Sequence, residues 1–403
     1  MNVLVAHNFY QVRGGEDQIY QDVADLLESH GHRVTRFAVH NDDLKGVGKL
    51  AMAKMTIWNS GAAKEIRQIV GRDKIDVVHF INTFPQISPA AYYAARRGGA
   101  AVVQEVQNFR LSCPAALFLR DGIVCEDCLG KTFAWPAIKY GCYRDSKSAS
   151  AVVASMLTTH RLLGTYRKSV DAYIATTEFG RSKLIEAGLP ADKMHVKPNF
   201  VSPDPGVGPG GGGFALFVGR LSKEKGIDVM LRAWEKLADV KLKIVGDGPL
   251  ADQVKAATAR LPQIEWLGRQ PVEEVMRIMG EAECLVFPSV WYEGLPKTIV
   301  ESLAKGTPVI ASKIGAMIEL IDHAHTGLHV PPGDPDALAA TVSGALKDRT
   351  ALSGMRAAAR EEFVAKYTPA GNYDQLIAIY EIARAVRTHL AGSTSAIAGV
   401  TSA

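Results

Sequence analysis

Short apolar runs rich in Val, Ile, Leu and Ala alternate with helical patterns along nearly the whole chain. In the first half, these runs predict strands at residues 2–7, 33–39, 76–81, 101–106, 171–176 and 195–198. In the second half, they predict strands at residues 214–218, 241–245, 264–267, 284–287, 308–311 and 327–330. Apolar strands that alternate with helices are typical of parallel sheets covered on both faces. The pattern therefore predicts an α/β fold with two similar halves.

A run rich in Pro and Gly, residues 202–213, lies between the two halves. Such a run disfavours a helix or a central strand, because Pro lacks a backbone N–H and Gly is highly flexible. We therefore interpret residues 201–213 as an interdomain linker between a Rossmann-like domain at 1–200 and a second one at 214–371. The small, polar segment 391–403 is expected to be a disordered tail.

Composition narrows the class of protein. A chain of 403 residues exceeds what one hydrophobic core usually serves, which supports two domains. A net charge of +4 is too small to argue for a nucleic-acid partner. No stretch approaches the roughly 20 apolar residues of a membrane span, and the first residues have the pattern of a buried strand rather than of a signal peptide. Five cysteines in so long a chain do not indicate a secreted disulfide framework, so we expect a cytoplasmic protein.

The most informative segment runs from Glu293 to Glu301, with the sequence EGLPKTIVE. It follows a predicted strand and leads into a helical pattern, and ligands bind at this end of parallel strands. Gly294 and Pro296 at the start of the helix leave backbone N–H groups to face an anion. Two acids around a helix N-terminus suit a ligand with hydroxyls at both ends and phosphates between, such as a nucleotide-sugar. The alternative is an ordinary helix whose acids are favoured by its dipole.

Two other strand ends in the second half carry loops of related chemistry. Arg220 and Lys225 follow the strand at 214–218, where a fork-shaped guanidinium and a point charge suit a diphosphate. The turn Gly246-Asp247-Gly248-Pro249 follows the strand at 241–245 and allows close backbone approach to a base or ribose. Each loop alone is a weak signal, and their coincidence in one domain is much stronger.

In the first half, Gly14 and Gly15 follow the first strand, where the backbone could approach a ligand. No G-x-G-x-x-G run follows any predicted strand, so a nicotinamide or flavin enzyme is disfavoured.

With these motifs, the chain resembles a family-4 glycosyltransferase of the GT-B fold, a class of retaining enzymes that use nucleotide-sugars. The matching elements span nearly the whole chain. They comprise Arg13-Gly14-Gly15, Gly219-Arg220-Leu221, Lys225-Gly226, Gly246-Asp247-Gly248-Pro249, Pro288-Ser289 followed by the E-x7-E pair Glu293 and Glu301, and residues 306–311. The resemblance implies two Rossmann-like domains that face a central cleft. It also implies a C-terminal helix, at about 372–390, that returns to the first domain.

The resemblance further implies a UDP- or GDP-sugar donor and a role for each site residue. Arg220 and Lys225 would bind the diphosphate and, with Glu293 facing the donor sugar, form the catalytic set. Glu301 would hold the ribose hydroxyls. The donor-binding residues would be Gly15, Arg220, Lys225, Gly246, Asp247, Gly248, Glu293, Gly294, Leu295, Pro296, Thr298 and Glu301. No metal would be required, because basic side chains and a helix terminus replace the cation.

The acceptor side is less well defined. We expect His7, Gly14 and Gln107 there. Gln107 stands where relatives often carry a histidine, in an H-N-Y/F-R stretch that reads Gln107-Asn108-Phe109-Arg110 here. Glutamine can form hydrogen bonds but cannot transfer protons near neutral pH as histidine does.

Four cysteines cluster after this stretch, at Cys113, Cys125, Cys128 and Cys142. The middle pair has the C-x2-C spacing that a structural zinc ion favours, and the flanking cysteines would complete a site of four thiolates. The alternative is four reduced thiols without a metal.

Residues 131–168 combine seven cations with Phe133, Trp135 and Tyr140. This composition suits an anionic membrane surface, or else a solvated helix beside a core. The resemblance adds a saccharide or polyprenyl-linked saccharide acceptor, made at the inner face of the membrane during exopolysaccharide or lipopolysaccharide synthesis. Two alternatives stay open. One is a nucleotide-sugar epimerase, and the other is a catalytically silent scaffold that binds nucleotide-sugars.

Overall fold

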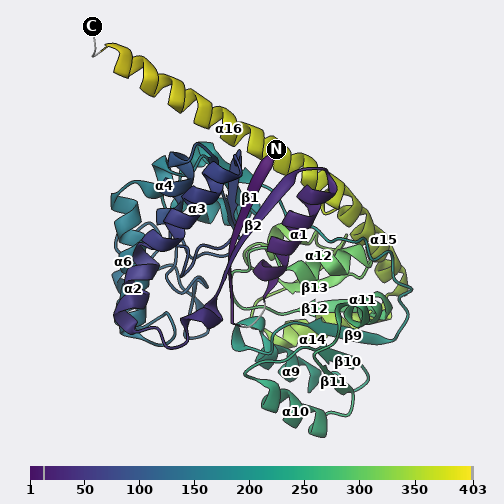
Figure 1. Ribbon diagram of the computed structural model, residues 1–403. Coiled ribbons are helices and arrows are strands. Elements are labelled where there is room, and N and C mark those ends of the chain that lie inside the picture. Colours follow the sequence, from purple (N-terminus) through teal and green to yellow (C-terminus); the bar gives the residue numbers. More distant parts are fainter. Residues whose placement is uncertain (12–13, 401–403) are drawn as a thin grey trace. The chain divides into compact units, whose positions relative to one another are not determined.

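The structure is a computed structural model that describes residues 1–11 and 14–400, with side chains described as far as His389. The chain forms two compact units. The first unit comprises Met1–Ala116, Glu126–Lys197 and Tyr373–Ala403, and the second comprises Leu117–Cys125 and Pro198–Asn372. Each unit has a parallel sheet with helices around it, as the alternation of apolar runs and helical patterns predicts (Figure 1).

The first unit contains a six-stranded sheet in the order β2-β1-β3-β4-β7-β8, in which every neighbouring pair is parallel. The strands are β1 Asn2–Phe9, β2 Arg33–His40, β3 Val77–Phe80, β4 Ala101–Val106, β7 Ala172–Ala175 and β8 Met194–Val196. The helices among them are α1 Gly15–Ser29, α2 Lys49–Ile57, α3 Ser60–Arg72, α4 Ala90–Arg97, α5 Trp135–Tyr140, α6 Lys147–Leu162, α7 Thr165–Lys168 and α8 Glu178–Glu186.

Helix α1 illustrates how the sequence produces this packing. Ile19, Val23 and Leu27 recur every four residues and are buried, so they form one face of the helix toward the sheet. The helix begins with a capping interaction, in which the Gly14 N–H donates to Asp17 Oδ2 at 2.8 Å. Asp17 also lies 2.8 Å from His7 Nε2 of β1, which holds the start of α1, next to the glycine pair, at the carboxyl end of β1.

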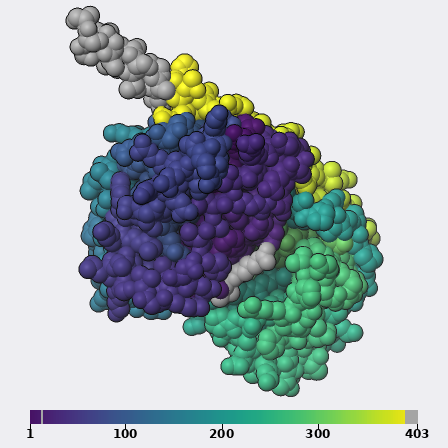
Figure 2. Space-filling model, viewed as in Figure 1, coloured from purple at the N-terminus to yellow at the C-terminus, as the bar shows by residue number. Residues whose placement is uncertain are grey.

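The C-terminal helix α16, Pro369–Val400, belongs to the first unit from Tyr373 onward and is yellow in Figure 1, as is its part up to residue 389 in Figure 2. The Tyr373 ring stacks on His30 with centroids 3.7 Å apart, and the Tyr380 hydroxyl lies 2.8 Å from His79 Nδ1 on β3. A returning helix at about 372–390 is what the resemblance implies. Residues 391–400, expected in a disordered tail, continue this helix, and residues 401–403 lie outside the described residues.

The second unit contains a parallel sheet in the order β11-β10-β9-β12-β13-β14. The strands are β9 Phe214–Val218, β10 Lys241–Val245, β11 Ile264–Gly268, β12 Cys284–Phe287, β13 Val309–Ser312 and β14 Gly327–Val330. The helices are α9 Ile227–Trp234, α10 Ala251–Arg260, α11 Val272–Glu281, α12 Lys297–Ala304, α13 Met317–Leu320, α14 Pro335–Lys347 and α15 Arg349–Lys366.

The Pro/Gly run that we interpreted as a linker belongs to the second unit. Its backbone N–H groups at Gly208, Gly210 and Gly212 donate to carbonyls at the ends of α11 and α12, at 2.8–2.9 Å. A Cβ on Gly208 would lie 2.1 Å from the Gly280 Cα, so only glycine allows this contact. The glycines therefore serve close packing, and the chain passes from the first unit to the second after Lys197.

A second difference concerns residues 117–125, which we placed within the domain at 1–200. This segment is a hairpin of β5 Leu119–Arg120 and β6 Ile123–Val124, and it belongs to the second unit. The fully buried Phe118 ring packs against Tyr292, with centroids 6.0 Å apart and the planes at 70°. No local pattern in the sequence reveals a contact between residues so distant along the chain.

Candidate active site

Three loops meet at the carboxyl ends of the neighbouring strands β10, β9 and β12 of the second unit (Figure 1). The Leu221 N–H donates to the Asp247 carbonyl at 3.0 Å, which joins the first two loops. The Val290 N–H donates to the Glu224 carbonyl at 3.0 Å, which joins the first loop to the third. The three segments that the sequence singles out are therefore brought together as one site.

Two glycines make this close approach possible. A Cβ on Gly246 would lie 1.9 Å from the Gly219 carbonyl oxygen, and a Cβ on Gly226 would lie 2.0 Å from the Pro288 carbonyl oxygen. Both residues also have positive φ angles, of 134° and 73°. Any side chain at either position would push the loops apart.

Glu293 lies at the centre of the three loops and is only 5% exposed. One oxygen, Oε1, receives three hydrogen bonds of 2.7 Å, from Ser289 Oγ, Trp291 Nε1 and Lys225 Nζ. The Lys225 ammonium also lies over the Trp291 ring, 5.6 Å from its centroid. The carboxylate is thus held in one orientation, and its charge is balanced by Lys225.

The other predicted donor residues of the second unit lie on the same three loops or on α12. Arg220 is exposed at the end of β9, and Glu301 lies on α12, whose first turn contains Thr298. Asp247 accepts a hydrogen bond of 2.7 Å from the Gly248 N–H and forms an ion pair of 3.4 Å with Arg269. The segment Gly294-Leu295-Pro296 leads directly into the N-terminus of α12, where the helix dipole favours an anion.

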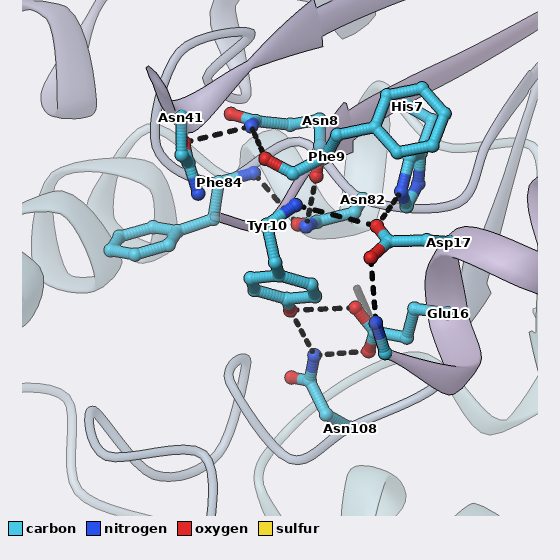
Figure 3. A network of polar contacts seen from close by, with 11 residues as sticks. His7, Asn8, Phe9, Tyr10, Glu16, Asp17, Asn41, Asn82, Phe84 and Asn108 are labelled. Atoms are coloured by element: carbon cyan, nitrogen blue, oxygen red, sulfur yellow. Dashed lines mark hydrogen bonds and ion pairs between the residues drawn. The ribbon is translucent and has the colours of Figure 1, made fainter. Parts of the chain in front are cut away.

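In the first unit, a polar network lies at the carboxyl end of β1 (Figure 3). The Tyr10 hydroxyl donates to Glu16 Oε2 at 2.6 Å, and Asn108 Nδ2 donates to Glu16 Oε1 at 2.5 Å. Behind them, His7 Nε2 lies 2.8 Å from Asp17 Oδ1. Side chains from two strand ends and from the start of α1 therefore converge on Glu16 and Asp17.

The two carboxyl groups differ in acidity. Burial raises the pKa of Glu16, although hydrogen bonds from Tyr10 and Asn108 oppose the shift. For Asp17, burial acts in the same direction, but hydrogen bonds from His7 and from the Gly14 N–H outweigh it and lower the pKa. Burial, together with the nearby Glu16 charge, raises the pKa of Tyr10 well above its usual value. Glu16 is the carboxyl group here that is suited to binding a proton.

The predicted acceptor residues lie around this network. His7 is fully buried, so it supports Asp17 instead of facing solvent. The Gln107 amide donates to Glu105 Oε1 at 2.5 Å. Gly15 begins α1, Gly14 caps it, and Arg13 lies outside the described residues.

Sequence reasoning missed Glu16, Tyr10 and Asn108, and also Trp291 beside Glu293. It named Ser289 only as part of the Pro288-Ser289 motif, without a role in the site. Their positions in the sequence could have revealed them, because they lie near strand ends and next to the motifs that the sequence analysis names.

The four clustered cysteines are divided between the units. Cys113, Cys128 and Cys142 belong to the first unit and Cys125 to the second. Cys128 and Cys142 pack with alanines of α5 and α6 in a small apolar cluster. Among the described residues, no group of three His, Cys, Asp or Glu side chains is arranged to hold a metal ion. The structural zinc ion stays a prediction.

Two sequence families match the chain. The family described as "Glycosyl transferase 4-like domain" matches residues 13–199, and the family described as "Glycosyl transferases group 1" matches residues 206–362. The second match contains all three loops of the site. Two Rossmann-like units with these loops define the GT-B class of protein. The chain belongs to the family-4-like glycosyltransferases of this class.

Curated relatives match part of the chain. The amylovoran biosynthesis glycosyltransferase AmsK of Erwinia amylovora is 30% identical over 224 residues, which cover 49% of this chain and 53% of that protein. An uncharacterized glycosyltransferase of Methanocaldococcus jannaschii is 31% identical over 174 residues, 42% of this chain and 44% of that protein. The chain thus matches about half the length of these relatives.

Solved structures share the fold over nearly the whole chain. Anabaena HepE in complex with UDP superposes with a TM-score of 0.63 at 16% identity, over 98% of this chain and 100% of that one. The lipopolysaccharide outer core galactosyltransferase WaaB superposes with a TM-score of 0.62 at 16% identity, over 94% of this chain and 99% of that one.

Proposed function

We propose that the protein transfers a sugar from a nucleoside-diphosphate sugar to a saccharide acceptor with retention of configuration. The observation that carries the proposal is Glu293, held by three donors and paired with Lys225 at the junction of three strand-end loops. A buried carboxylate fixed in this way suits the hydroxyls of a donor sugar. The nearby cations and the N-terminus of α12 suit its diphosphate.

In the proposed reaction, an acceptor hydroxyl bonds to the anomeric carbon on the face that the diphosphate leaves. The bond between this carbon and the phosphate oxygen breaks, and the hydroxyl proton passes to that oxygen. Arg220 and Lys225 stabilise the charge that develops on the diphosphate, and Glu301 orients the ribose. Because positioned charges supply the stabilisation, the proposal requires no metal ion.

A uridine nucleotide is the first donor to test. HepE, which shares the fold, was crystallised with UDP and with UDP-glucose. GDP-sugars are the alternative donors. The turn from Gly246 to Gly248 would contact the base through its backbone, so its side chains do not reveal which base is bound.

The acceptor side supports a saccharide on a lipid carrier at the inner face of the membrane. The described helices include none with the length and apolarity of a membrane span. The exposed Trp135 and Leu162, at 51% and 73%, lie among the cations of residues 131–168, which suits peripheral contact with an anionic surface. AmsK, a partial relative, is named for a role in polysaccharide synthesis.

The test measures thermal stabilisation and product release with UDP-glucose, UDP-galactose and GDP-mannose. We expect one nucleotide to raise the melting temperature, and Lys225→Met and Glu301→Gln to remove the effect. Lys255→Met, on the exposed face of α10, is the matched control. Failure of every nucleotide to bind at millimolar concentration would contradict the proposal. An epimerized nucleotide-sugar would favour the epimerase, and binding without any turnover would favour a scaffold.

A further inference from the structure

The hairpin of residues 117–125 belongs to the second unit, although the chain on both sides of it belongs to the first. It pairs β5 with β6 around the turn Asp121-Gly122, whose residues have positive φ angles of 53° and 80°. This turn geometry matches the twist of paired strands, and the dipeptide Asp-Gly favours it. The Cys125 N–H donates to the Phe118 carbonyl at 2.8 Å and closes the base of the hairpin. The sequence therefore produces a short hairpin with a defined shape.

The chain enters the hairpin through a strained segment. Ala116, the last residue of the first unit before the hairpin, has a φ angle of 67°, and Phe118 has one of 48°. Positive φ is uncommon for residues with a side chain, above all for a bulky one such as phenylalanine. Such conformations persist only where the surrounding structure holds them, and they cluster at active sites and ligand clamps. The packing of Phe118 therefore determines where the hairpin lies.

The Phe118 ring connects the hairpin to the donor loop, which we define as residues 288–296 between β12 and α12. The ring is fully buried and contacts Tyr292 edge to face, with centroids 6.0 Å apart. A hairpin of two strands is only marginally stable by itself, so its position depends on this packing. Tyr292 lies between Trp291 and Glu293, and the Trp291 indole donates to Glu293 Oε1 at 2.7 Å. The aromatic contact therefore restrains the residues on both sides of Tyr292.

A second segment holds the same loop. Asn199, which is 3% exposed, donates from Nδ2 to the Leu295 carbonyl at 3.4 Å. Asn199 lies two residues after Lys197, where the first unit ends. The chain enters the second unit from the first at residues 117 and 198, and the segment that follows each entry contacts the donor loop.

We propose that the hairpin is a strap that positions Glu293 for the donor sugar, with Phe118 and Tyr292 as its positioning residues. Phe118 acts through Tyr292 and sets the path of residues 291–293, and this path sets the direction of the Glu293 carboxylate. The inference deepens the proposed function and rests on it, because that function assigns the sugar to Glu293. Small displacements matter at such a residue, since a shift of about 1 Å in a positioning group can reduce a rate about 100-fold.

Amide hydrogen exchange of the protein without a ligand tests the strap directly. Phe118→Ala should speed exchange in residues 289–295 about tenfold, because the loop opens locally, and should leave residues 246–250 unchanged. Phe118→Leu keeps an apolar side chain at the buried position and serves if the alanine variant does not fold. It should accelerate exchange in the same residues to a smaller extent. Unchanged exchange in residues 289–295 of the folded variant would overturn the inference.

Two control variants match this change. Ile123→Ala removes an apolar side chain of the same hairpin that is 72% exposed. Phe214→Ala removes a buried ring at the amino end of β9, at the edge of the sheet opposite the three loops. Neither should accelerate exchange in residues 289–295 relative to residues 246–250. An equal acceleration in Phe214→Ala would show that the loss of any buried ring loosens the loop, and this would contradict the strap.

Donor binding tests whether the strap serves the sugar. UDP-glucose, UDP-galactose and GDP-mannose are titrated into the wild type and into Phe118→Ala, each beside its free nucleoside diphosphate. Phe118→Ala should weaken the nucleotide-sugar about tenfold, the loss expected for one misplaced hydrogen bond to a charged group, and leave UDP or GDP nearly unchanged. A merely structural role would weaken both ligands alike. Equal weakening of the two, or weakening of neither, would overturn the inference.

The wild type separates this inference from the proposed function. If it binds none of the nucleotides, the proposed function fails, and the role of the strap in sugar binding fails with it. If it binds a nucleotide-sugar and Phe118→Ala changes neither exchange nor sugar binding, the strap is wrong and the transferase stands.

Discussion

At the scale of single residues, Glu293 shows how a buried charge can be retained in a binding site. Three donors converge on one of its oxygens, and one of them, Lys225, carries the opposite charge. Removing one partner of a buried pair leaves the other charge uncompensated, whereas replacing both partners can be nearly neutral. We therefore expect that replacing both Glu293 and Lys225 restores stability without restoring donor binding.

Lys225→Met should lower the free energy of unfolding by roughly 3 kcal/mol, the lower end of the range for a broken buried pair, because the lysine is itself partly exposed. The double variant Lys225→Met with Glu293→Gln should recover much of that loss, yet it should still fail to bind the donor. Chemical denaturation and nucleotide titration measure the two properties. Recovery of nucleotide binding in the double variant would contradict the role given to Lys225.

Glu16 leads to a prediction about pH. Its pKa is raised in the folded protein, chiefly by burial, so the native state binds the extra proton between the ordinary carboxyl pKa and the raised one. Stability should therefore fall as the pH rises through that window. Glu16→Gln should raise the melting temperature at pH 8 and leave it nearly unchanged at pH 4. Glu65→Gln, an exposed carboxyl group of α3, is the control and should show no such difference. An equal shift in the melting temperature at both pH values would contradict the binding of a proton by the buried Glu16 carboxylate.

The sequence reveals some of these residues and not others. Arg220, Lys225, Glu293 and Glu301 could be singled out because they stand at strand ends and in a recognisable spacing. The contacts of Ser289 and Trp291 with Glu293 could not be predicted, because they depend on the path of the loop. Glu16 was passed over beside the glycine pair, since only the folded chain brings Tyr10 and Asn108 to it.

At the scale of elements, the strands were predictable because buried parallel strands are continuous apolar runs. The Pro/Gly run was misinterpreted for a physical reason. The same glycines that make a free chain flexible also permit backbones to approach closely, as Gly208 does at Gly280. Composition alone does not distinguish the two uses. The hairpin at residues 117–125 was missed because its partner, Tyr292, lies far along the chain.

The central strands of the first unit carry a buried ion cluster that also involves α16. Glu105 on β4 lies 3.2 Å from His79 Nε2 and 3.7 Å from Lys197 Nζ, and the Tyr380 hydroxyl bonds to the same histidine. Although burial opposes it, the Lys197 charge and the His79 hydrogen bond lower the pKa of Glu105 to about 2. A depressed carboxyl pKa contributes stability above its ordinary value of 4.5, and this contribution is lost as the pH falls toward about 2.

Lys197→Met should therefore destabilise the first unit most at neutral pH, by about 3–5 kcal/mol, because it leaves Glu105 buried without its main counter-charge. The difference from the wild type should shrink as the pH falls from 7 to 3, because the variant's buried carboxyl group, without the Lys197 charge, takes up a proton more readily. Urea denaturation at pH 7 and pH 3 measures this change. Lys64→Met on the exposed face of α3 is the control, and a loss of stability that did not vary with pH would point to packing alone.

At the scale of the whole molecule, each unit has its own hydrophobic core. One core is built around β1, β3 and β4, and the other around β9, β10 and β12. The two-domain organisation followed from chain length and from the repeated strand pattern. The residues at which the chain passes from one unit to the other could not be predicted from the sequence, because they depend on which core each connecting segment packs against.

This division predicts where the donor acts. A ligand that binds only the native state stabilises it by about 2.7 kcal/mol at a concentration of 100 times its Kd, and the effect is largest in amides whose exchange requires the binding site to open. In hydrogen–deuterium exchange, UDP should therefore protect most strongly the loops at residues 219–226, 246–250 and 288–301. Glu301→Gln should abolish this protection, because we propose that Glu301 holds the ribose of the donor. Protection spread evenly over both units would contradict a donor site at these loops.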